Sequence, residues 1–121
     1  FKYVLQGVTQ TAQAQNTVLF LGVNGGQPAI NNTEFTVPYD SKFTSVIINV
    51  DSTPAPGETF TFDIRRNATI AGTGVISNGS FAVTIAPTTV DVQAGDILAI
   101  RSTFSTNSGS ANVRYRLYLQ A

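Results

Sequence analysis

Apolar and polar residues alternate along most of the chain, and this period of two predicts β-strands. In one segment Phe81, Val83 and Ile85 alternate with small or polar residues, which places them on one face of a strand. Pro87 ends that run because proline has no backbone donor for a sheet ladder. Residues 97–104 then form a long strand that is apolar on both faces over its first half, which is typical of a strand inside a sandwich or at an interface.

The same alternation predicts further strands on both sides of this segment, and no segment has a helical period. Turns rich in glycine, proline and asparagine separate the strands at the short spacing expected of a sandwich or jelly roll. The expected strands cover residues 1–9, 18–23, 35–39, 43–51, 59–64, 70–76, 81–85, 97–104 and 113–120. The expected turns include Asn24-Gly25-Gly26, Arg65-Arg66-Asn67, Asn78-Gly79 and Ala94-Gly95-Asp96, the second and third as hairpin tips.

We therefore expect an all-β fold: one jelly-roll domain of two packed antiparallel sheets spanning residues 1–121. The chain is 42% hydrophobic and only 12% charged, which is enough apolar material for a core and too little charge for disorder. Alternation within the strands selects the side chains that fill the interior. Those expected there are Phe60, Phe62, Ile64, Phe81, Val83, Ile85, Leu98 and Ile100.

Composition argues against catalysis and metal binding. The chain has no Cys and no His, which removes most nucleophile–base pairs and most metal-ligand sets. A glycosidase with two carboxylates stays formally open, and Asp63 and Asp96 are the acids nearest to apolar strands. We interpret Asp96 as a turn cap and Asp63 as the ion-pair partner of Arg65, two residues along the same face. We therefore predict a protein that is not an enzyme, with no catalytic residue, metal or cofactor.

The charges balance, with seven basic and seven acidic residues. A neutral chain has no overall field to attract nucleic acid or an anionic membrane. No apolar run approaches the roughly 18 residues of a membrane helix. We therefore expect neither nucleic-acid binding nor membrane insertion. The chain begins at Phe1 without methionine, so we expect it to be the C-terminal part of a longer fibrous protein.

Three arginines near the C-terminus have two interpretations. Arg101, Arg114 and Arg116 follow Asp96, and no acid follows them. They are either solvated or ion-paired residues at sheet edges, or they bind an anion or an acid across a subunit interface. Three N-x-S/T sequons also occur in expected loops or turns, at Asn31, Asn67 and Asn78.

Two stretches resemble C1q/TNF-like jelly rolls. The order VDVQAGDILAIRS, a polar tip and the aromatic strand VRYRLYLQA resembles the last two strands of that family, with Gly95 and Asp96 in the turn before the penultimate strand. The stretch PAPGETFTFDIRRNATIAG is similar to a module of bacterial and viral versions, which form trimeric heads on spore-surface filaments and phage or viral fibres. The Gly-x-Tyr-x-Phe signature of animal C1q domains is missing from the strand at Phe43, so the calcium sites of those domains are not carried over.

The resemblance implies a homotrimer in which residues 113–120 pair with residues 1–9. It also implies a non-enzymatic, extracellular head of a spore-surface, cell-surface, virion or phage-fibre protein, which attaches to a receptor or glycan. Strand parity allows only some of the axis-lining candidates to face the axis. These candidates are Tyr3, Leu5, Tyr115, Leu117 and Tyr118. A carbohydrate-binding module of a larger secreted protein is the alternative, although the chain has no Trp and only four Tyr.

Overall fold

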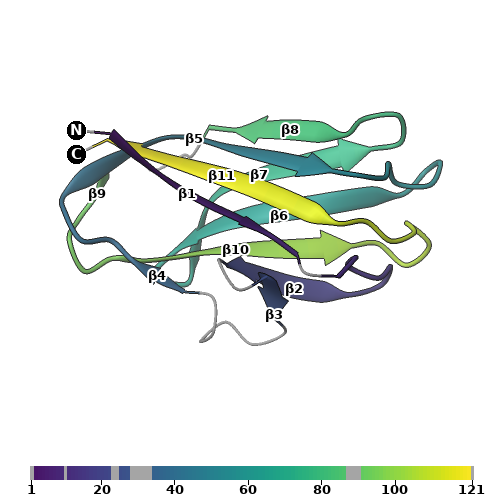
Figure 1. Ribbon diagram of the computed structural model, residues 1–121, viewed down its shortest axis with the longest axis horizontal. Helices are drawn as coiled ribbons and strands as arrows, with labels where there is room; N and C mark the ends of the chain where they lie inside the picture. The colour runs from purple at the N-terminus through teal and green to yellow at the C-terminus, as the bar shows by residue number, and fades with distance from the viewer. Residues whose placement is uncertain (1, 10, 23–24, 28–33, 87–90, 121) are drawn as a thin grey trace.

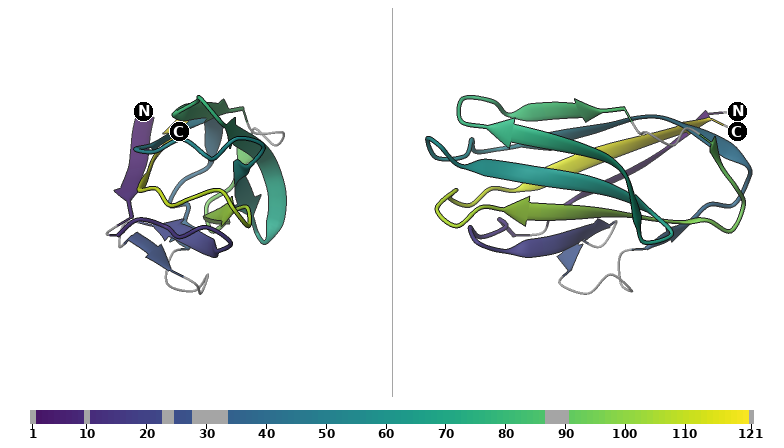
Figure 2. Two further views of the ribbon diagram at one scale, coloured as in Figure 1. Left: turned by 90° about the vertical axis from the view of Figure 1, so that its right-hand side faces the viewer. Right: turned by 180° about the vertical axis from the view of Figure 1, so that it is seen from behind.

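The structure is a computed structural model that describes residues 2–9, 11–22, 25–27, 34–86 and 91–120. These residues form two stacked antiparallel β-sheets and contain no helix (Figure 1). The two ends of the chain lie side by side, and views from the end and from behind show the two layers (Figure 2). The predicted positions Asn24, Asn31 and Pro87 lie outside the described residues.

The first sheet contains the first and the last strand of the chain. Its order is β1 (Lys2–Val8), β11 (Val113–Gln120), β5 (Ser41–Val50) and β8 (Ala82–Ile85), and β9 (Asp91–Val92) also pairs with β5. Strand β1 runs antiparallel to β11 from the pair Lys2 and Gln120 to the pair Val8 and Arg114. The predicted pairing of the first and last strands is therefore confirmed.

The second sheet is built around β10 (Ile97–Phe104). Its order is β3 (Gly25–Gln27), β2 (Val18–Gly22), β10, β6 (Thr59–Arg66) and β7 (Thr69–Ser77), and β4 (Phe35–Thr36) pairs with the start of β10. Of the apolar residues in the first half of β10, Leu98, Ala99 and Ile100 are buried, whereas Ile97 is 38% exposed. The links from β1 to β2, β5 to β6, β7 to β8 and β10 to β11 each cross between the sheets, as in a jelly roll.

The core lies between the sheets and contains most of the predicted interior residues. Phe60, Phe62, Ile64, Ile85, Leu98 and Ile100 are each at most 3% exposed, and Val83 packs against this core. The prediction for Phe81 is wrong, because its side chain is 52% exposed. Phe81 precedes β8, which is the edge strand of its sheet, and its carbonyl accepts a hydrogen bond from the Val50 amide. Side chains of β8 meet the other sheet only further along the strand.

Two glycines allow the edges of the two sheets to approach each other. A Cβ atom on Gly74 in β7 would lie 2.6 Å from Cγ1 of Ile85 in β8. A Cβ atom on Gly7 in β1 would lie 2.6 Å from the carbonyl oxygen of Gly22 in β2. Both distances are shorter than real Cβ contacts, so a side chain at either position would push the sheets apart.

Three predicted turns differ from the structure. Strand β6 continues through Arg66, and the hairpin tip is Asn67-Ala68, whose φ angles of 49° and 67° suit a type I′ turn. Asn78-Gly79 does form a turn, but it is not a hairpin tip because β7 and β8 belong to different sheets. Gly25 and Gly26 lie in β3, paired with β2, rather than in the turn.

Candidate interaction surface

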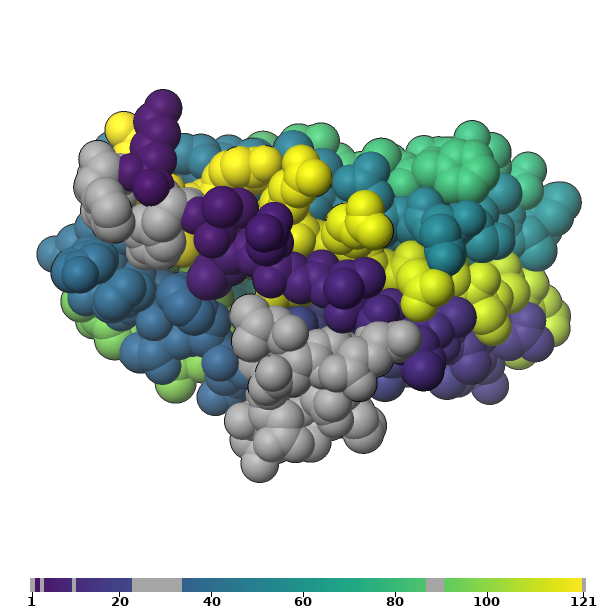
Figure 3. All heavy atoms as spheres, in the orientation of Figure 1, coloured from purple at the N-terminus to yellow at the C-terminus, as the bar shows by residue number. Residues whose placement is uncertain are grey.

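The most distinctive surface is the side of the first sheet that faces away from the core. We call the side chains of β1, β11 and β5 that point outward the outer face. Alternation separates them clearly from inward neighbours such as Val113 and Leu119, which are buried. The outer face consists of Lys2, Val4, Gln6, Val8, Lys42, Thr44, Ser45, Ile47, Asn49, Arg114, Arg116, Tyr118 and Gln120. In the space-filling view, atoms of β1 and β11 run across the middle of the side turned to the viewer (Figure 3).

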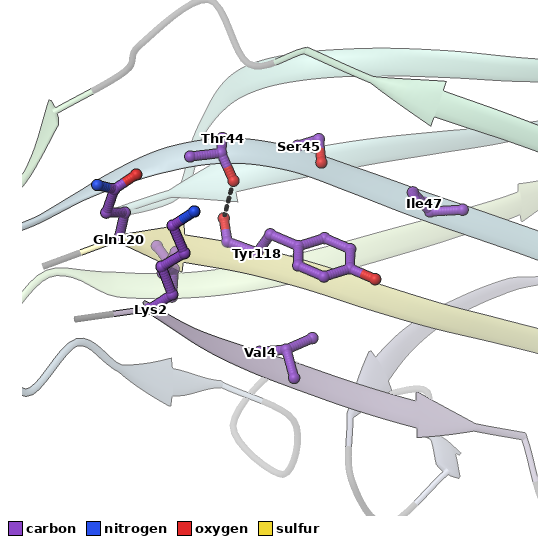
Figure 4. Close-up of a pocket in the computed structure, with 8 residues that line it drawn as sticks. Lys2, Val4, Thr44, Ser45, Ile47, Tyr118 and Gln120 are labelled. Carbon is purple, nitrogen blue, oxygen red and sulfur yellow. Dashed lines mark hydrogen bonds between the residues drawn. The ribbon is translucent and has the colours of Figure 1, made fainter.

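A shallow hollow of about 520 Å³ lies on the outer face, around Tyr118. The register places Tyr118 between Val4 of β1 and Ser45 of β5. The Tyr118 side chain is half-buried, and its ring lies along the sheet (Figure 4). The backbone carbonyl of Tyr118 accepts a hydrogen bond from Thr44 Oγ1 at 3.3 Å. The hollow therefore combines an aromatic ring and aliphatic groups with hydrogen-bonding groups at its border. It is lined by Lys2, Val4, Thr44, Ser45, Ile47, Tyr118, Leu119 and Gln120.

The outer face carries four cations and no acid. Two of them lie close to acids at its border. Lys42 Nζ lies 3.9 Å from Asp91 Oδ1, with both side chains exposed. Hydrogen bonds from Asn112 are the main reason that the pKa of Asp51 is lowered, and the charge of Arg114 adds to that effect. The border acids therefore offset only part of the positive charge of the outer face.

The other two cations of the outer face, Lys2 and Arg116, are both exposed. Neither side chain has an ion-pair or hydrogen-bond partner among the residues that the structure describes. Arg116 lies on the central strand of the three, between Gln6 of β1 and Ile47 of β5. An uncompensated positive charge therefore lies in the middle of the outer face.

Arg101 lies on the other sheet and is paired within the chain. Its Nη2 and Nε donate to Asp63 Oδ2 at 2.6 and 3.1 Å. The predicted pair of Asp63 with Arg65 is wrong, because the register places Arg101 directly opposite Asp63 on the neighbouring strand. The Arg65 guanidinium instead lies 5.9 Å from the centre of the Phe20 ring.

Asp96 caps a turn, as predicted. Its carboxylate accepts hydrogen bonds from the Gln93 amide at 2.8 Å, from Asn67 Nδ2 at 3.0 Å and from Arg66 Nε at 2.8 Å. These donors, the Gln93 amide first, lower the pKa of Asp96 to about 2. Gly95, with a φ of 92°, takes the left-handed conformation of the turn. The carboxylate of Asp96 is therefore fully used by the fold.

The predicted axis-lining residues separate by strand parity. Tyr115 and Leu117 are buried in the core, and burial raises the pKa of the Tyr115 hydroxyl. Leu5 packs against the same core. Tyr118 faces outward into the hollow. For Tyr3 the structure describes only the backbone, which pairs with that of Leu119.

Sequence reasoning missed Lys2, Val4 and Ile47 as members of the hollow. The signal was present in the alternation, because Ile47 is an apolar residue on the otherwise polar side of its strand. Val4 likewise shares a face with Lys2 and Gln6 in the first strand. Placing these residues beside Tyr118 required the register between the strands, which the sequence did not supply.

Both described sequon asparagines use their side-chain amides in the fold. Asn67 donates to Asp96 and accepts a hydrogen bond from the Ile97 amide at 2.9 Å. Asn78 Nδ2 donates to the Pro54 carbonyl at 2.8 Å. A glycan attached to either Nδ2 atom would leave that nitrogen with one hydrogen. The internal hydrogen bond would then be lost or would have to be made by the remaining hydrogen.

The described residues form neither a metal-binding cluster nor a membrane-spanning helix. Groups of three or more His, Cys, Asp or Glu side chains that could hold a metal do not occur there. Helices long and apolar enough to cross a membrane are absent from the same part of the chain.

Comparison with known proteins gives a match at the level of the fold. No protein-family model and no curated protein sequence matches the chain. Among solved structures, a chain of the cyanophage Pam1 capsid asymmetric unit is similar, with a TM-score of 0.57 and 12% sequence identity. The alignment covers 99% of this chain and 83% of the capsid chain. At this identity the similarity concerns the fold alone, and it agrees with an antiparallel jelly roll of two sheets.

Proposed function

We propose that the chain is a non-enzymatic structural protein of a virion that assembles with copies of itself through the outer face. The observation that carries this proposal is the apolar hollow on a sheet face that no other part of the described chain covers. Val4, which lies opposite Tyr118 in the register and lines this hollow, is 44% exposed. Adjacent exposed apolar side chains commonly mark protein interfaces. The fold similarity to a capsid chain supports the virion setting.

The assembly we propose is a homotrimer whose axis is lined by β1 and β11. Of the candidate axis-lining residues predicted from the sequence, Tyr118 is the one that we propose as a contact. A closed ring of copies buries the exposed apolar side chains of each copy and does not grow into an open filament. In this proposal the chain is one domain of a longer fibrous protein. The trimer forms its extracellular head and attaches it to a receptor or host surface. The resemblance to trimeric heads of bacterial and viral fibres supports these finer features.

The test compares two valines of similar exposure on opposite sheets. Val4 is 44% exposed on the outer face, and Val75 is 47% exposed on β7 of the other sheet. In sedimentation velocity at micromolar concentration, the parent and Val75→Ser are expected to run as trimers. Val4→Ser combined with Tyr118→Ala is expected to dissociate while its far-UV spectrum stays that of a β protein. A folded parent that is monomeric at this concentration contradicts the proposal.

A carbohydrate-binding module is the second candidate, and one feature of the hollow favours it. Tyr118 shares the hollow with Thr44, Ser45 and Gln120, which can donate and accept hydrogen bonds. A half-buried aromatic ring with polar groups beside it suits a sugar ring. Titration with neutral oligosaccharides, followed by the fluorescence of the chain, tests this reading. Saturable binding by a monomeric parent that Tyr118→Ala abolishes supports the module and contradicts the trimer.

A further inference from the structure

Arg116 is an exposed guanidinium with unused hydrogen-bond donors in the centre of the outer face. Its neighbours in register, Gln6 and Ile47, are uncharged. No described residue forms a hydrogen bond or an ion pair with the Arg116 guanidinium. A guanidinium presents five N–H donors in one plane, arranged to match two oxygens of a carboxylate, sulfate or phosphate.

Two arginines of the second sheet contrast with Arg116. Arg66 Nε lies 2.8 Å from Asp96 Oδ2, and Arg101 Nη2 lies 2.6 Å from Asp63 Oδ2. Two acids of an overall neutral chain are thus committed to the second sheet. The outer face of the first sheet keeps its positive charge, with Arg116 on one side of Tyr118 along the strands and Lys2 on the other.

Covering the outer face with other copies changes the surroundings of Arg116. In a closed ring of copies, each residue near the axis is repeated around it, so several guanidinium groups approach one another. Water is removed at the same time, which strengthens the repulsion between like charges. A charge that is buried without a partner strongly opposes assembly. Apolar contacts at Val4 and Tyr118 therefore need a counter-charge near Arg116.

We propose that Arg116 binds an oxyanion at the contact between copies, and that this anion promotes assembly. The inference rests on the proposed self-association through the outer face. The ligand chemistry is a sulfate, phosphate or carboxylate group, which the guanidinium fork binds through two parallel hydrogen bonds. Gln6, opposite Arg116 in the register, contributes an amide donor on the same face. Neutralising the cations couples anion binding to association of the copies.

The experiment measures self-association of the full chain in different sodium salts at equal ionic strength. Sulfate, phosphate and acetate are each compared with chloride by sedimentation equilibrium, which also distinguishes the three kinds of oxyanion. Sulfate stabilises many proteins by exclusion from their surface, so the informative quantity is the difference between variants. Arg116→Gln removes the proposed ligand-binding group. Lys42→Gln is the matched control, because it removes one positive charge from the border of the same face.

For the parent and Lys42→Gln, at least one oxyanion is expected to tighten association by roughly 5–150-fold over chloride, the usual range for coupled binding. Arg116→Gln is expected to lose that gain, and Arg116→Lys, which keeps the charge without the fork, to keep only part of it. Equal gains in the parent and Arg116→Gln mean an adventitious ion only and overturn the inference. A trimer that no oxyanion affects overturns it too, while self-association stands. A monomer in every salt overturns both.

Discussion

Arg101 and Asp63 face each other across two neighbouring strands, and the arginine donates two hydrogen bonds to one oxygen of the carboxylate. The donor–acceptor distances are 2.6 Å from Nη2 and 3.1 Å from Nε. Thr73 Oγ1 donates to the other carboxylate oxygen at 2.9 Å. The side chain of Asp63 is only 9% exposed although it points away from the core, because its neighbours on the sheet cover it.

Replacing Arg101 with alanine should leave the carboxylate of Asp63 largely buried without its cation. Hydrogen bonds to charged groups contribute about 1.5–3 kcal/mol each, so we expect Arg101→Ala to lower the free energy of unfolding by roughly 1–3 kcal/mol. Urea denaturation measures this change. Arg114→Ala is the control, because Arg114 has no hydrogen-bonded carboxylate, and it should stay within about 0.5 kcal/mol of the parent. Equal effects of the two substitutions contradict the assigned role of the pair.

Two phenylalanines test the position of the core. Phe62 is fully buried, whereas Phe81 is 52% exposed. Phe62→Ala should destabilise the protein by about 3–5 kcal/mol, because it leaves a cavity between the sheets. Phe81→Ala should cost about 1 kcal/mol, since much of its surface is already in water. Urea unfolding of the two variants separates them, and a loss at Phe81 as large as that at Phe62 would refute the arrangement described for β8.

Local pattern was sufficient to predict most strands. Residues 97–104 and 113–120 were predicted with the bounds that the structure has, because the alternation is strong and turn residues flank them. Phe81 shows the limit of this reasoning. A period of two assigns a residue to a face, but it does not say whether the opposite sheet extends far enough to cover it. Asn78-Gly79 shows another limit, because a turn sequence does not say whether the next strand joins the same sheet.

The candidate surface depended on information that alternation alone does not carry. Strand parity places Tyr115 and Tyr118 on opposite faces of β11, but it does not say which of the two faces meets the core. The partner of Asp63 was set by the register between β6 and β10, and Arg101 is 38 residues away in sequence. The neighbour two residues along the same strand was therefore the wrong choice. Register between distant strands depends on the whole sandwich, so no short stretch encodes it.

The low pKa of Asp96 predicts a loss of stability in acid. The pKa falls from 3.8 to about 2 on folding, chiefly because the Gln93 amide donates to the carboxylate. Below the unfolded pKa the unfolded chain binds a proton that the folded chain does not. The stabilisation is therefore present above about pH 4 and is lost as the pH falls toward 2.

Thermal melts at several pH values test this role of Asp96. Asp96→Asn should melt below the parent at neutral pH, and the difference should shrink as the pH falls from about 4 to about 2. Asp91→Asn is the control, because the carboxylate of Asp91 makes only a 3.9 Å contact with Lys42 and is exposed. It should keep the parent's dependence on pH. A gap between Asp96→Asn and the parent that stays constant down to pH 2 would argue against the predicted linkage.

The hairpin tip of β6 and β7 offers a stabilising substitution at Ala68. Its φ of 67° lies in the left-handed region, where a residue with a Cβ atom pays about 1–2 kcal/mol relative to glycine. Replacing alanine with glycine also makes the unfolded chain more flexible, which lowers the free energy of unfolding by roughly 0.4–1 kcal/mol. Ala68→Gly should therefore stabilise the protein by roughly 0.5–1 kcal/mol, and Asn-Gly is the preferred pair for a type I′ turn.

Urea denaturation of Ala68→Gly is best compared with Ala94→Gly. Ala94 also lies in a turn, but its φ is not in the left-handed region, so glycine relieves no strain there. Only the cost in the unfolded chain remains, and Ala94→Gly should destabilise the protein by about 0.4–1 kcal/mol. The two substitutions should thus have opposite signs although they make the same chemical change. If both destabilise the protein by the same amount, the left-handed conformation of Ala68 carries no strain.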